Sequence, residues 1–257
     1  MEEEKNIEIK EAITVVKNNN NQQIVGAIIL AGVLIAGAIL LRGSGAPTPN
    51  VGGVKVAIDE AKITKAVPIF SACLDSGKYT QAIADSKAEA TTAGVNGTPK
   101  GFILRDGKII NTIDGAEPFA TVKQKIDDVL AGKGKTISNI KLAPVTSSDF
   151  TLGNPQAKVA LVLYEDFQCP FCGRFFSDSE KTIRDTYVKN GDVQFVYRDF
   201  AFLGQESIKA AEAARCASDQ GKFWEYYDYL FTHQNGENQG NFSNAYLKSF
   251  AKELGLK

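Results

Sequence analysis

Two cysteines separated by a proline and a phenylalanine, Cys169 and Cys172, place the tightest constraint on what this chain can fold into. They follow the apolar run VALVLY (159–164), which is typical of a strand buried on both faces, and they precede a helix-like run toward Val188. Pro170 suits the first turn of a helix, where its missing N–H has no consequence. The sequence therefore predicts that Cys169 lies at the N-terminus of a helix that follows a buried strand.

Three chemistries are open to such a pair: metal binding, a structural disulfide, and redox exchange. A structural zinc site needs four nitrogen or sulfur ligands, and the other candidates, Cys73, Cys216 and His233, are scattered without a second CxxC or CxxH pattern. We therefore expect no metal and no cofactor. A disulfide across two intervening residues is strained, and strained disulfides are easily reduced. The spacing favours redox exchange, in which a thiolate at Cys169 is stabilised by the helix N-terminus and Cys172 resolves the mixed disulfide.

A second feature is the uncharged segment IVGAIILAGVLIAGAILL (24–41). About 18 helical residues span roughly 27 Å, close to the hydrocarbon thickness of a bilayer. We predict a transmembrane helix here; the alternative is a cleavable signal peptide, although its n-region would be unusually long and rich in glutamate. Residues 1–23 are polar and predict a disordered tail, and residues 42–64, which include GSGAPTPNVGG, predict a flexible linker.

The cysteine content also bears on location. Four cysteines in a chain with a membrane segment fit an oxidising compartment. We therefore expect a single-pass protein of the cell membrane, with residues 43–257 outside the cytoplasm, in the periplasm or at the cell surface. The formal net charge of −1 and the lack of a basic run argue against nucleic acid as a partner.

The remainder of the chain alternates helix-like and strand-like segments. The expected elements are a helix at 79–93, a hairpin of strands 101–104 and 108–113, a helix at 119–130, strands at 159–164 and 193–197, and helices within 206–256. A polar connector covers roughly 131–148. This pattern predicts an α/β layer with a helical insertion.

Several segments resemble DsbA-like thiol–disulfide oxidoreductases of the thioredoxin superfamily. They are LGNPQAKVALVLYEDFQCPFCGRFF, FVYRDF, AAEAARCASDQGKFWEYYDYLF, FAKELGL, CLDSGKY, GVNGTPKGFIL and DGAEPF. Together they cover nearly all of 65–257, and their joint occurrence is far more specific than one CxxC. The resemblance implies a thioredoxin-like fold with an inserted helical subdomain, preceded here by one transmembrane helix.

The resemblance also implies roles for individual residues. Cys169 matches the exposed attacking cysteine of the family, and Cys172 matches the resolving one. Thr98-Pro99 matches the loop whose proline is cis, faces the cysteine pair and presents backbone groups to an extended substrate. Pro170 is expected to share in substrate binding.

Two further implications concern the remaining cysteines and the residue between the catalytic pair. Cys73 and Cys216 match two further cysteines of the family, implying a structural disulfide in the helical subdomain; two free buried thiols are the alternative. Phe171 stands where strongly oxidising members carry histidine, so we expect a milder oxidant. Its apolar ring suits the docking of unfolded substrates.

The chain departs from the family in the order of its halves. The half with the expected cis-proline (65–131) precedes the half with the CPFC motif (142–257), which reads as a circular permutation. Such an order is physically reasonable because domain termini often lie close together. A dimer with swapped halves, or an order that reflects how the sequence was assembled, are the alternatives.

A second departure is Leu163, which stands where thioredoxin-like proteins commonly carry a buried acid that helps to move the proton of the resolving thiol. Glu165 and Asp166 are near in sequence. Glu165 would point to the same face as Leu163 only if the strand continues that far. A buried acid and a solvated strand end both remain open for each of these residues.

The function implied is a membrane-tethered oxidoreductase that introduces disulfides into reduced or unfolded secreted proteins. The resemblance implies a quinone-linked membrane partner that reoxidises the cysteine pair, and residues 24–41 would provide the membrane contact. Disulfide isomerase or reductase activity is an alternative within the same class. A redox-inactive thioredoxin-like module that binds extended polypeptides is an alternative from a different class.

Overall fold

The computed structural model describes residues 58–257. The predicted tail (1–23), the predicted membrane helix (24–41) and most of the predicted linker lie outside these residues. Within residues 58–257 no helix is long and apolar enough to cross a membrane.

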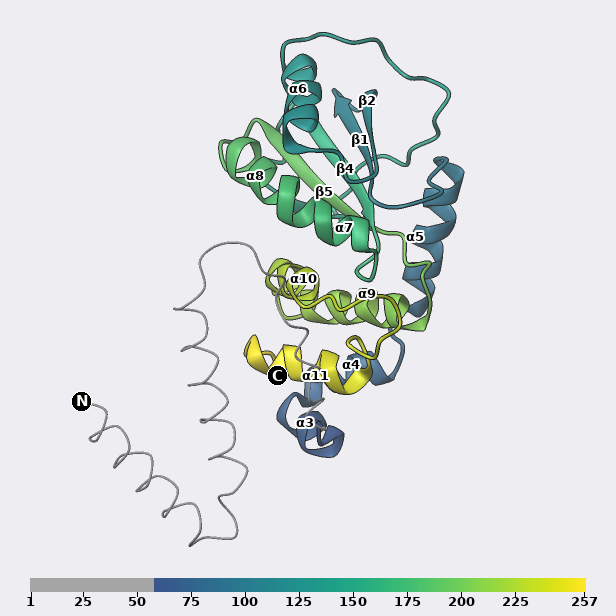
Figure 1. The fold of residues 1–257 in the computed structure, drawn as a ribbon, viewed down its shortest axis with the longest axis vertical. Coiled ribbons are helices and arrows are strands. Elements are labelled where there is room, and N and C mark those ends of the chain that lie inside the picture. Colours follow the sequence, from purple (N-terminus) through teal and green to yellow (C-terminus); the bar gives the residue numbers. More distant parts are fainter. Residues whose placement is uncertain (1–57) are drawn as a thin grey trace, which may run out of the picture. The chain divides into compact units, whose positions relative to one another are not determined.

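A five-stranded mixed sheet forms the centre of the fold, in the order β2-β1-β4-β5-β3 (Figure 1). The strands are β1 (Lys100–Arg105), β2 (Lys108–Asp114), β3 (Phe150–Leu152), β4 (Val159–Glu165) and β5 (Val193–Asp199). β4 and β5 are parallel, and the other neighbouring pairs are antiparallel. The hairpin β1–β2, which comes early in the chain, therefore pairs with a strand of the later half.

The two faces of the sheet bury different sets of side chains, because successive residues of a strand point to opposite faces. Leu161 and Leu163 belong to the larger core, which α6 (Phe119–Leu130) and the helix beginning with α7 (Pro170–Phe175) cover. That helix continues through η1 (Phe176–Glu180), α8 (Lys181–Ile183) and η2 (Arg184–Val188). Val162 and Tyr164 face a smaller core under α5 (Thr80–Thr92).

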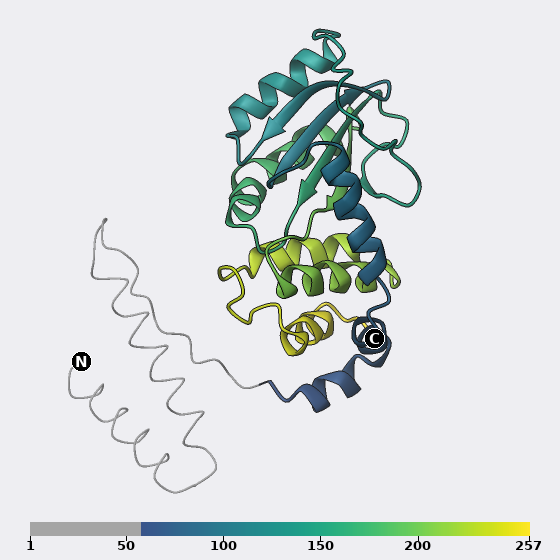
Figure 2. The same cartoon turned by 90° about the vertical axis from the view of Figure 1, so that its right-hand side faces the viewer.

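A helical subdomain lies against one end of the sheet (Figure 2). It contains α3 (Glu60–Ala66), α4 (Pro68–Asp75), α9 (Gln205–Ser218), α10 (Phe223–Thr232) and α11 (Asn244–Glu253). Helices from both ends of the described chain therefore pack together, and the Phe70 N–H donates to the Lys257 carbonyl at 2.6 Å.

The linker expected over 42–64 ends earlier than predicted, because α3 begins at Glu60. Asp59 caps this helix by accepting a hydrogen bond from the Lys62 N–H at 3.1 Å. Ile63 packs against the larger core, and the buried Lys248 ammonium binds Glu60 at 3.2 Å. The composition of 42–64 could not indicate these contacts, because Lys248, which binds Glu60, lies near the other end of the chain.

The connector after α6 contains no helix or strand up to β3, yet it is held against the sheet. Ile137 and other apolar residues of this stretch pack on the smaller core. The Arg198 guanidinium, 5% exposed, donates to the carbonyls of Ala143 and Pro144 at 3.1 and 2.9 Å, and it pairs with Asp149 at 2.7 Å. One buried cation on β5 therefore fixes the path of the connector.

Candidate active site

The cysteine pair lies at the junction of β4 and α7. Cys169 is the N-cap residue of α7, and Pro170 occupies the first helical position, as the sequence predicts. The Cys169 N–H donates to the Asp166 carbonyl at 3.0 Å, and the Cys169 carbonyl accepts from the Gly173 N–H at 3.1 Å. Both Cys169 and Cys172 are free thiols in the structure.

The loop before β1 brings Thr98 and Pro99 to this pair. The Thr98-Pro99 peptide bond is cis. Lys100 at the start of β1 lies opposite Tyr164 near the end of β4. Because the two strands are antiparallel, the loop preceding β1 meets the segment that follows β4. The Cys169 Sγ consequently lies 3.4 Å from the Thr98 carbonyl oxygen.

Exposure differs sharply among the residues of the CPFC motif. Cys169 is 4% exposed, so the expectation of an exposed attacking thiol is wrong for this structure. The Thr98 carbonyl covers part of its sulfur. Cys172 is fully buried, whereas the Phe171 ring is 54% exposed and Pro170 is exposed. The motif therefore presents the exposed apolar side chains of Pro170 and Phe171 beside a Cys169 residue that is almost completely buried.

The two thiols differ in acidity. Hydrogen bonds from the Cys172 thiol and from the backbone of Phe171 and Cys172 lower the pKa of Cys169 to about 6, against the effect of burial. Burial raises the pKa of Cys172 well above its ordinary value, and the hydrogen bond to Cys169 adds to this. At neutral pH the pair is therefore a thiolate at Cys169 and a thiol at Cys172.

The buried acid of the site is Glu165. β4 continues to Glu165, so this side chain points to the same face as Leu163 and is fully buried. Burial raises the pKa of Glu165 well above its usual range, and the nearby charge of Glu180 raises it further. The solvated strand end is thus wrong for Glu165. Glu165 is therefore a buried acid, two residues further along β4 than Leu163 and on the same face.

Asp166 is also buried, but its role is structural. Its carboxylate accepts hydrogen bonds from the Phe202 and Leu203 N–H groups at 2.8 and 3.1 Å, and from the Ser207 hydroxyl at 2.7 Å. A fourth hydrogen bond to this carboxylate comes from the Gln168 N–H at 2.8 Å. These contacts fix the turn after β4 against the segment after β5.

Gln234 is a residue that sequence reasoning missed. Its Nε2 donates to the carbonyls of Phe167 and Cys169 at 2.5 and 3.2 Å. Gly173 leaves room for this contact, because a Cβ there would lie 2.0 Å from the Gln234 Oε1. The polar stretch that contains Gln234 has no motif, so only the tertiary structure shows that it holds the cysteine loop. His233 next to it stacks on Tyr229 and is exposed.

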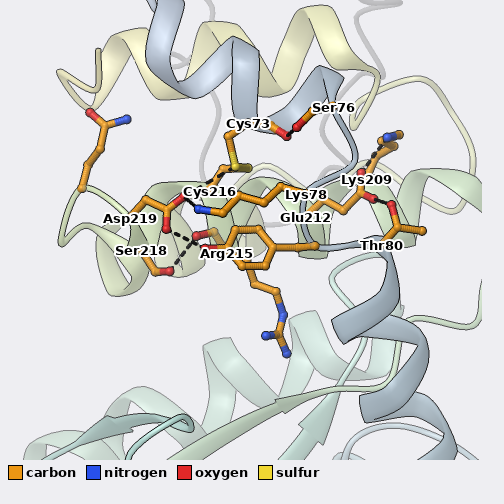
Figure 3. Close-up of a disulfide and its surroundings, with 12 residues drawn as sticks. Cys73, Ser76, Lys78, Thr80, Lys209, Glu212, Arg215, Cys216, Ser218 and Asp219 are labelled. Atoms are coloured by element: carbon orange, nitrogen blue, oxygen red, sulfur yellow. Dashed lines mark hydrogen bonds and ion pairs between the residues drawn. A yellow bond between two sulfur atoms is a disulfide. The ribbon is translucent and has the colours of Figure 1, made fainter.

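Cys73 of α4 and Cys216 of α9 form a disulfide within the helical subdomain (Figure 3). They are 143 residues apart in sequence. Beside the disulfide, Lys78 pairs with Asp219 at 2.7 Å and the Tyr79 hydroxyl donates to the same carboxylate at 2.5 Å. The disulfide thus ties α4, from the earlier half, to α9, from the later half. Among the described residues, no group of three or more His, Cys, Asp or Glu side chains is placed to hold a metal ion.

A thioredoxin-like sheet that brings a CxxC helix and a cis-proline together defines the class of thiol–disulfide oxidoreductases. Residues 146–256 match the family model Thioredoxin_4, described as thioredoxin. "Probable disulfide bond formation protein D" of Bacillus cereus is 29% identical over 109 residues, which are 42% of this chain and 50% of that protein. Over these residues of its later half the chain is similar to the thioredoxin family and to a protein named for disulfide bond formation.

Two further proteins are similar to part of this chain. "Na(+)/H(+) antiporter NhaA 1" of Salinispora arenicola is 32% identical over 129 residues, which are 49% of this chain and 18% of that protein. The crystal structure of alpha-DsbA1 from Wolbachia pipientis has 23% identity and a TM-score of 0.40, covering 44% of this chain and 57% of that one. The chain spans half or less of the length of these curated relatives.

Proposed function

We propose that this protein is a membrane-anchored thiol–disulfide oxidoreductase that introduces disulfides into extracytoplasmic proteins through Cys169 and Cys172. The observation that carries the proposal is the difference in thiol pKa between Cys169 and Cys172. The pKa of Cys169 is lowered to about 6, and the fully buried Cys172 has a pKa raised well above its ordinary value. A low-pKa sulfur is a good leaving group, so a mixed disulfide through Cys169 is readily released.

The exchange reaction follows from this asymmetry. A substrate thiolate attacks the Cys169 Sγ of the Cys169–Cys172 disulfide, the bond between the two sulfurs breaks, and Cys172 leaves and takes a proton. A second substrate thiolate then attacks the substrate sulfur of the mixed disulfide, and Cys169 leaves as a thiolate. The substrate loses two electrons as its disulfide forms, and the enzyme gains them.

The substrate surface would combine Thr98, Pro99, Pro170 and Phe171. The exposed Phe171 ring offers an apolar contact next to the Cys169 sulfur, which suits reduced or unfolded secreted proteins. Lys100 at the start of β1 directly follows this loop, so an extended segment bound there would lie along the same edge of the site.

The anchor, the location and the electron acceptor belong to the same proposal. Residues 24–41 would hold the enzyme in the cell membrane, with the catalytic domain in the periplasm or at the cell surface. A quinone-linked membrane protein would take the two electrons from the reduced pair and restore its disulfide.

We also propose that the halves of the domain are circularly permuted and complete one site within one chain. Thr98 and Cys169 come from the earlier and the later half and meet at 3.4 Å. The hydrogen bond from Phe70 to Lys257 joins segments near both ends of the described chain, as expected where the original connection would have been. A monomeric mass in solution with full activity would support this order, and activity found only in a dimer would support swapped halves instead.

The reduction potential of the purified full chain tests the function. A value of about −120 mV indicates an oxidant, and one of about −270 mV indicates a reductase. Cys169→Ser and Cys172→Ser should each abolish the transition, and Cys172→Ser should accumulate mixed disulfides with substrate proteins. The absence of any dithiol transition at Cys169 and Cys172 in the wild type would refute the proposal and leave a polypeptide-binding module.

A further inference from the structure

The loop after β2 (residues 115–118) contacts the cis-proline loop on one side and the helix of the CPFC motif on the other. The Gly115 N–H donates to the Pro99 carbonyl at 2.9 Å. The Glu117 carbonyl accepts from the Ser179 hydroxyl at 2.9 Å, and Ser179 is fully buried in η1, which continues the CPFC helix. The loop after β2 therefore bridges the two segments that meet at the active site.

The Glu117 side chain closes this loop on itself. Its Oε1 accepts from the Asp114 N–H at 3.0 Å, and the Glu117 N–H donates to the Gly115 carbonyl at 2.8 Å. Gly115 has a φ of +77°, in the left-handed region that glycine adopts without strain. A loop this short makes too few hydrogen bonds to offset the entropy of ordering its own backbone. Its geometry therefore depends on whatever holds the Glu117 carboxylate in place.

Lys125 of α6 holds that carboxylate. Its Nζ lies 2.7 and 2.6 Å from the two carboxylate oxygens of Glu117, and it also donates to the Thr112 carbonyl of β2 at 2.8 Å. The side chains of Lys125 and Glu117 are 24% and 17% exposed, so solvent and salt weaken this ion pair less than a fully exposed one. One ammonium group thus fixes the loop to both β2 and α6.

A second ion pair near this loop is weaker. Lys100, which follows Pro99, binds Asp114 at the end of β2. The Asp114 side chain is 64% exposed, and ion pairs that open to solvent contribute little. The pair of Glu117 and Lys125 is therefore the stronger of the two ionic links that hold the loop.

A shift of this loop would disturb two parts of the site at once. The Pro99 carbonyl is bonded to the loop, and the neighbouring Thr98 carbonyl lies 3.4 Å from the Cys169 Sγ. The loop also forms one wall of a surface cavity of about 430 Å³, whose other wall is the CPFC helix at Arg174. The Arg174 guanidinium in turn lies over the exposed Phe171 ring at 5.0 Å. The cis-proline loop and the apolar surface beside Cys169 thus share one support.

We propose that Glu117 and Lys125 are positioning residues, which hold the cis-proline loop at a fixed distance from the CPFC helix so that an extended substrate meets both in place. This inference rests on the proposed function and assigns to its substrate step two residues that touch neither sulfur. A loop that is already ordered loses less conformational entropy when a substrate binds. The pair therefore strengthens substrate binding and leaves the intrinsic reactivity of the sulfurs unchanged.

Hydrogen–deuterium exchange of the reduced full chain, followed by NMR, tests the positioning without using activity. The Gly115 amide should exchange about tenfold faster, relative to the core amides of β4, in Lys125→Met and in Ser179→Ala. The matched control is Lys123→Met, because Lys123 also lies on α6 but pairs with Asp127 of the same helix at 2.5 Å. This control should keep the wild-type exchange rate. An equal rate in the wild type and in Lys125→Met would overturn the inference.

Oxidation of a synthetic unfolded peptide with two cysteines by the oxidised full chain tests the consequence for substrates. In Glu117→Gln and Lys125→Met, the peptide concentration that gives half the maximum rate should rise about fivefold to tenfold, with the maximum rate unchanged. Lys125→Arg keeps the charge and the donors, so it should stay near the wild type. Reduction of the same proteins by dithiothreitol, which is too small to need the loop, should proceed at the wild-type rate.

The outcomes separate this inference from the proposed function. A wild-type half-saturation concentration in both Lys125→Met and Ser179→Ala would overturn the positioning role, and so would an equal rise in Lys123→Met. A matching fall in the dithiothreitol rate would also overturn it, because the pair would then act on the sulfurs. A wild type that exchanges no disulfides would refute the proposed function instead, and the Gly115 amide would still report whether the loop is held.

Discussion

Loss of the Cys169 thiolate should destabilise the reduced protein, and the structure gives the size of this effect. The pKa of Cys169 is lowered from 9.0 to about 6 in the fold, whereas a thiol in the unfolded chain keeps its ordinary value. A group with a lower pKa in the folded state stabilises the fold through its ionised form. That stabilisation is complete above the unfolded pKa and disappears as the pH falls through the folded pKa. For Cys169 it therefore grows from about pH 6 to about pH 9.

The free energy follows from the two pKa values. At about pH 7 the linkage contributes roughly 1.4 kcal/mol, at about pH 8 roughly 2.7 kcal/mol, and at about pH 5 almost nothing. Cys169 is 4% exposed, so solvent screens this contribution little. The pKa of Cys172 is raised, so Cys172 remains a thiol in both states over this range and does not change the balance.

Urea unfolding under reducing conditions, from about pH 5 to about pH 8, measures this contribution against Cys169→Ser, whose hydroxyl does not ionise. The difference in unfolding free energy between the two proteins should widen by roughly 2.5 kcal/mol toward high pH. Buried acids such as Glu180 titrate in both proteins and cancel. The ultraviolet absorbance of the thiolate should show a midpoint near 6 in the wild type. A difference that stays constant across this range would refute the stabilised thiolate.

Three further predictions concern the supports of the site. Replacing Cys73 and Cys216 together by alanine removes a cross-link between residues 143 apart in sequence. The unfolding free energy measured in urea should fall by about 3–5 kcal/mol, and a loss under about 1 kcal/mol would contradict this. Gln234→Ala should cost about 1–2 kcal/mol, because the Phe167 and Cys169 carbonyls each lose the hydrogen bond from this amide. Gly173→Ala displaces the same amide and should add little in the double variant, whereas fully additive losses in urea would argue against the contact. Arg198→Met leaves Asp149 without its cation and should lower the unfolding free energy by about 3 kcal/mol. It should also speed protease cleavage within 131–148, because the carbonyls of the connector lose their donor. Unchanged cleavage would show that the connector is held by other contacts.

Much of the site could be predicted because its signals are local. Cys169, Pro170 and Cys172 are set by spacing within one turn of helix. The run of apolar residues before them marks the strand, and the fold places each as that pattern predicts. Thr98 and Pro99 could be named only through resemblance to a family, since nothing near them in sequence shows what they face.

The identity of the buried acid depended on where one strand ends. Period-two alternation makes Glu165 face the core only if β4 reaches it, and the ends of strands are set by pairing with neighbours rather than by the residues alone. The register with β5, in which Glu165 lies opposite Asp199, decides this point.

The sequence by itself determined where the cysteine pair lies, because that position depends on short spacings, and it indicated the class of protein through the resemblance of several segments to a known family. The tertiary structure alone decided that the Tyr227 hydroxyl lies within hydrogen-bond distance of both Glu165 and Glu180, that Gln234 holds the cysteine loop, and that α3 belongs to the fold. Each of these contacts joins residues distant in the chain. They are stabilised by hydrogen bonds, ion pairs and apolar packing between segments that only the fold brings together, and no local pattern records which groups will meet.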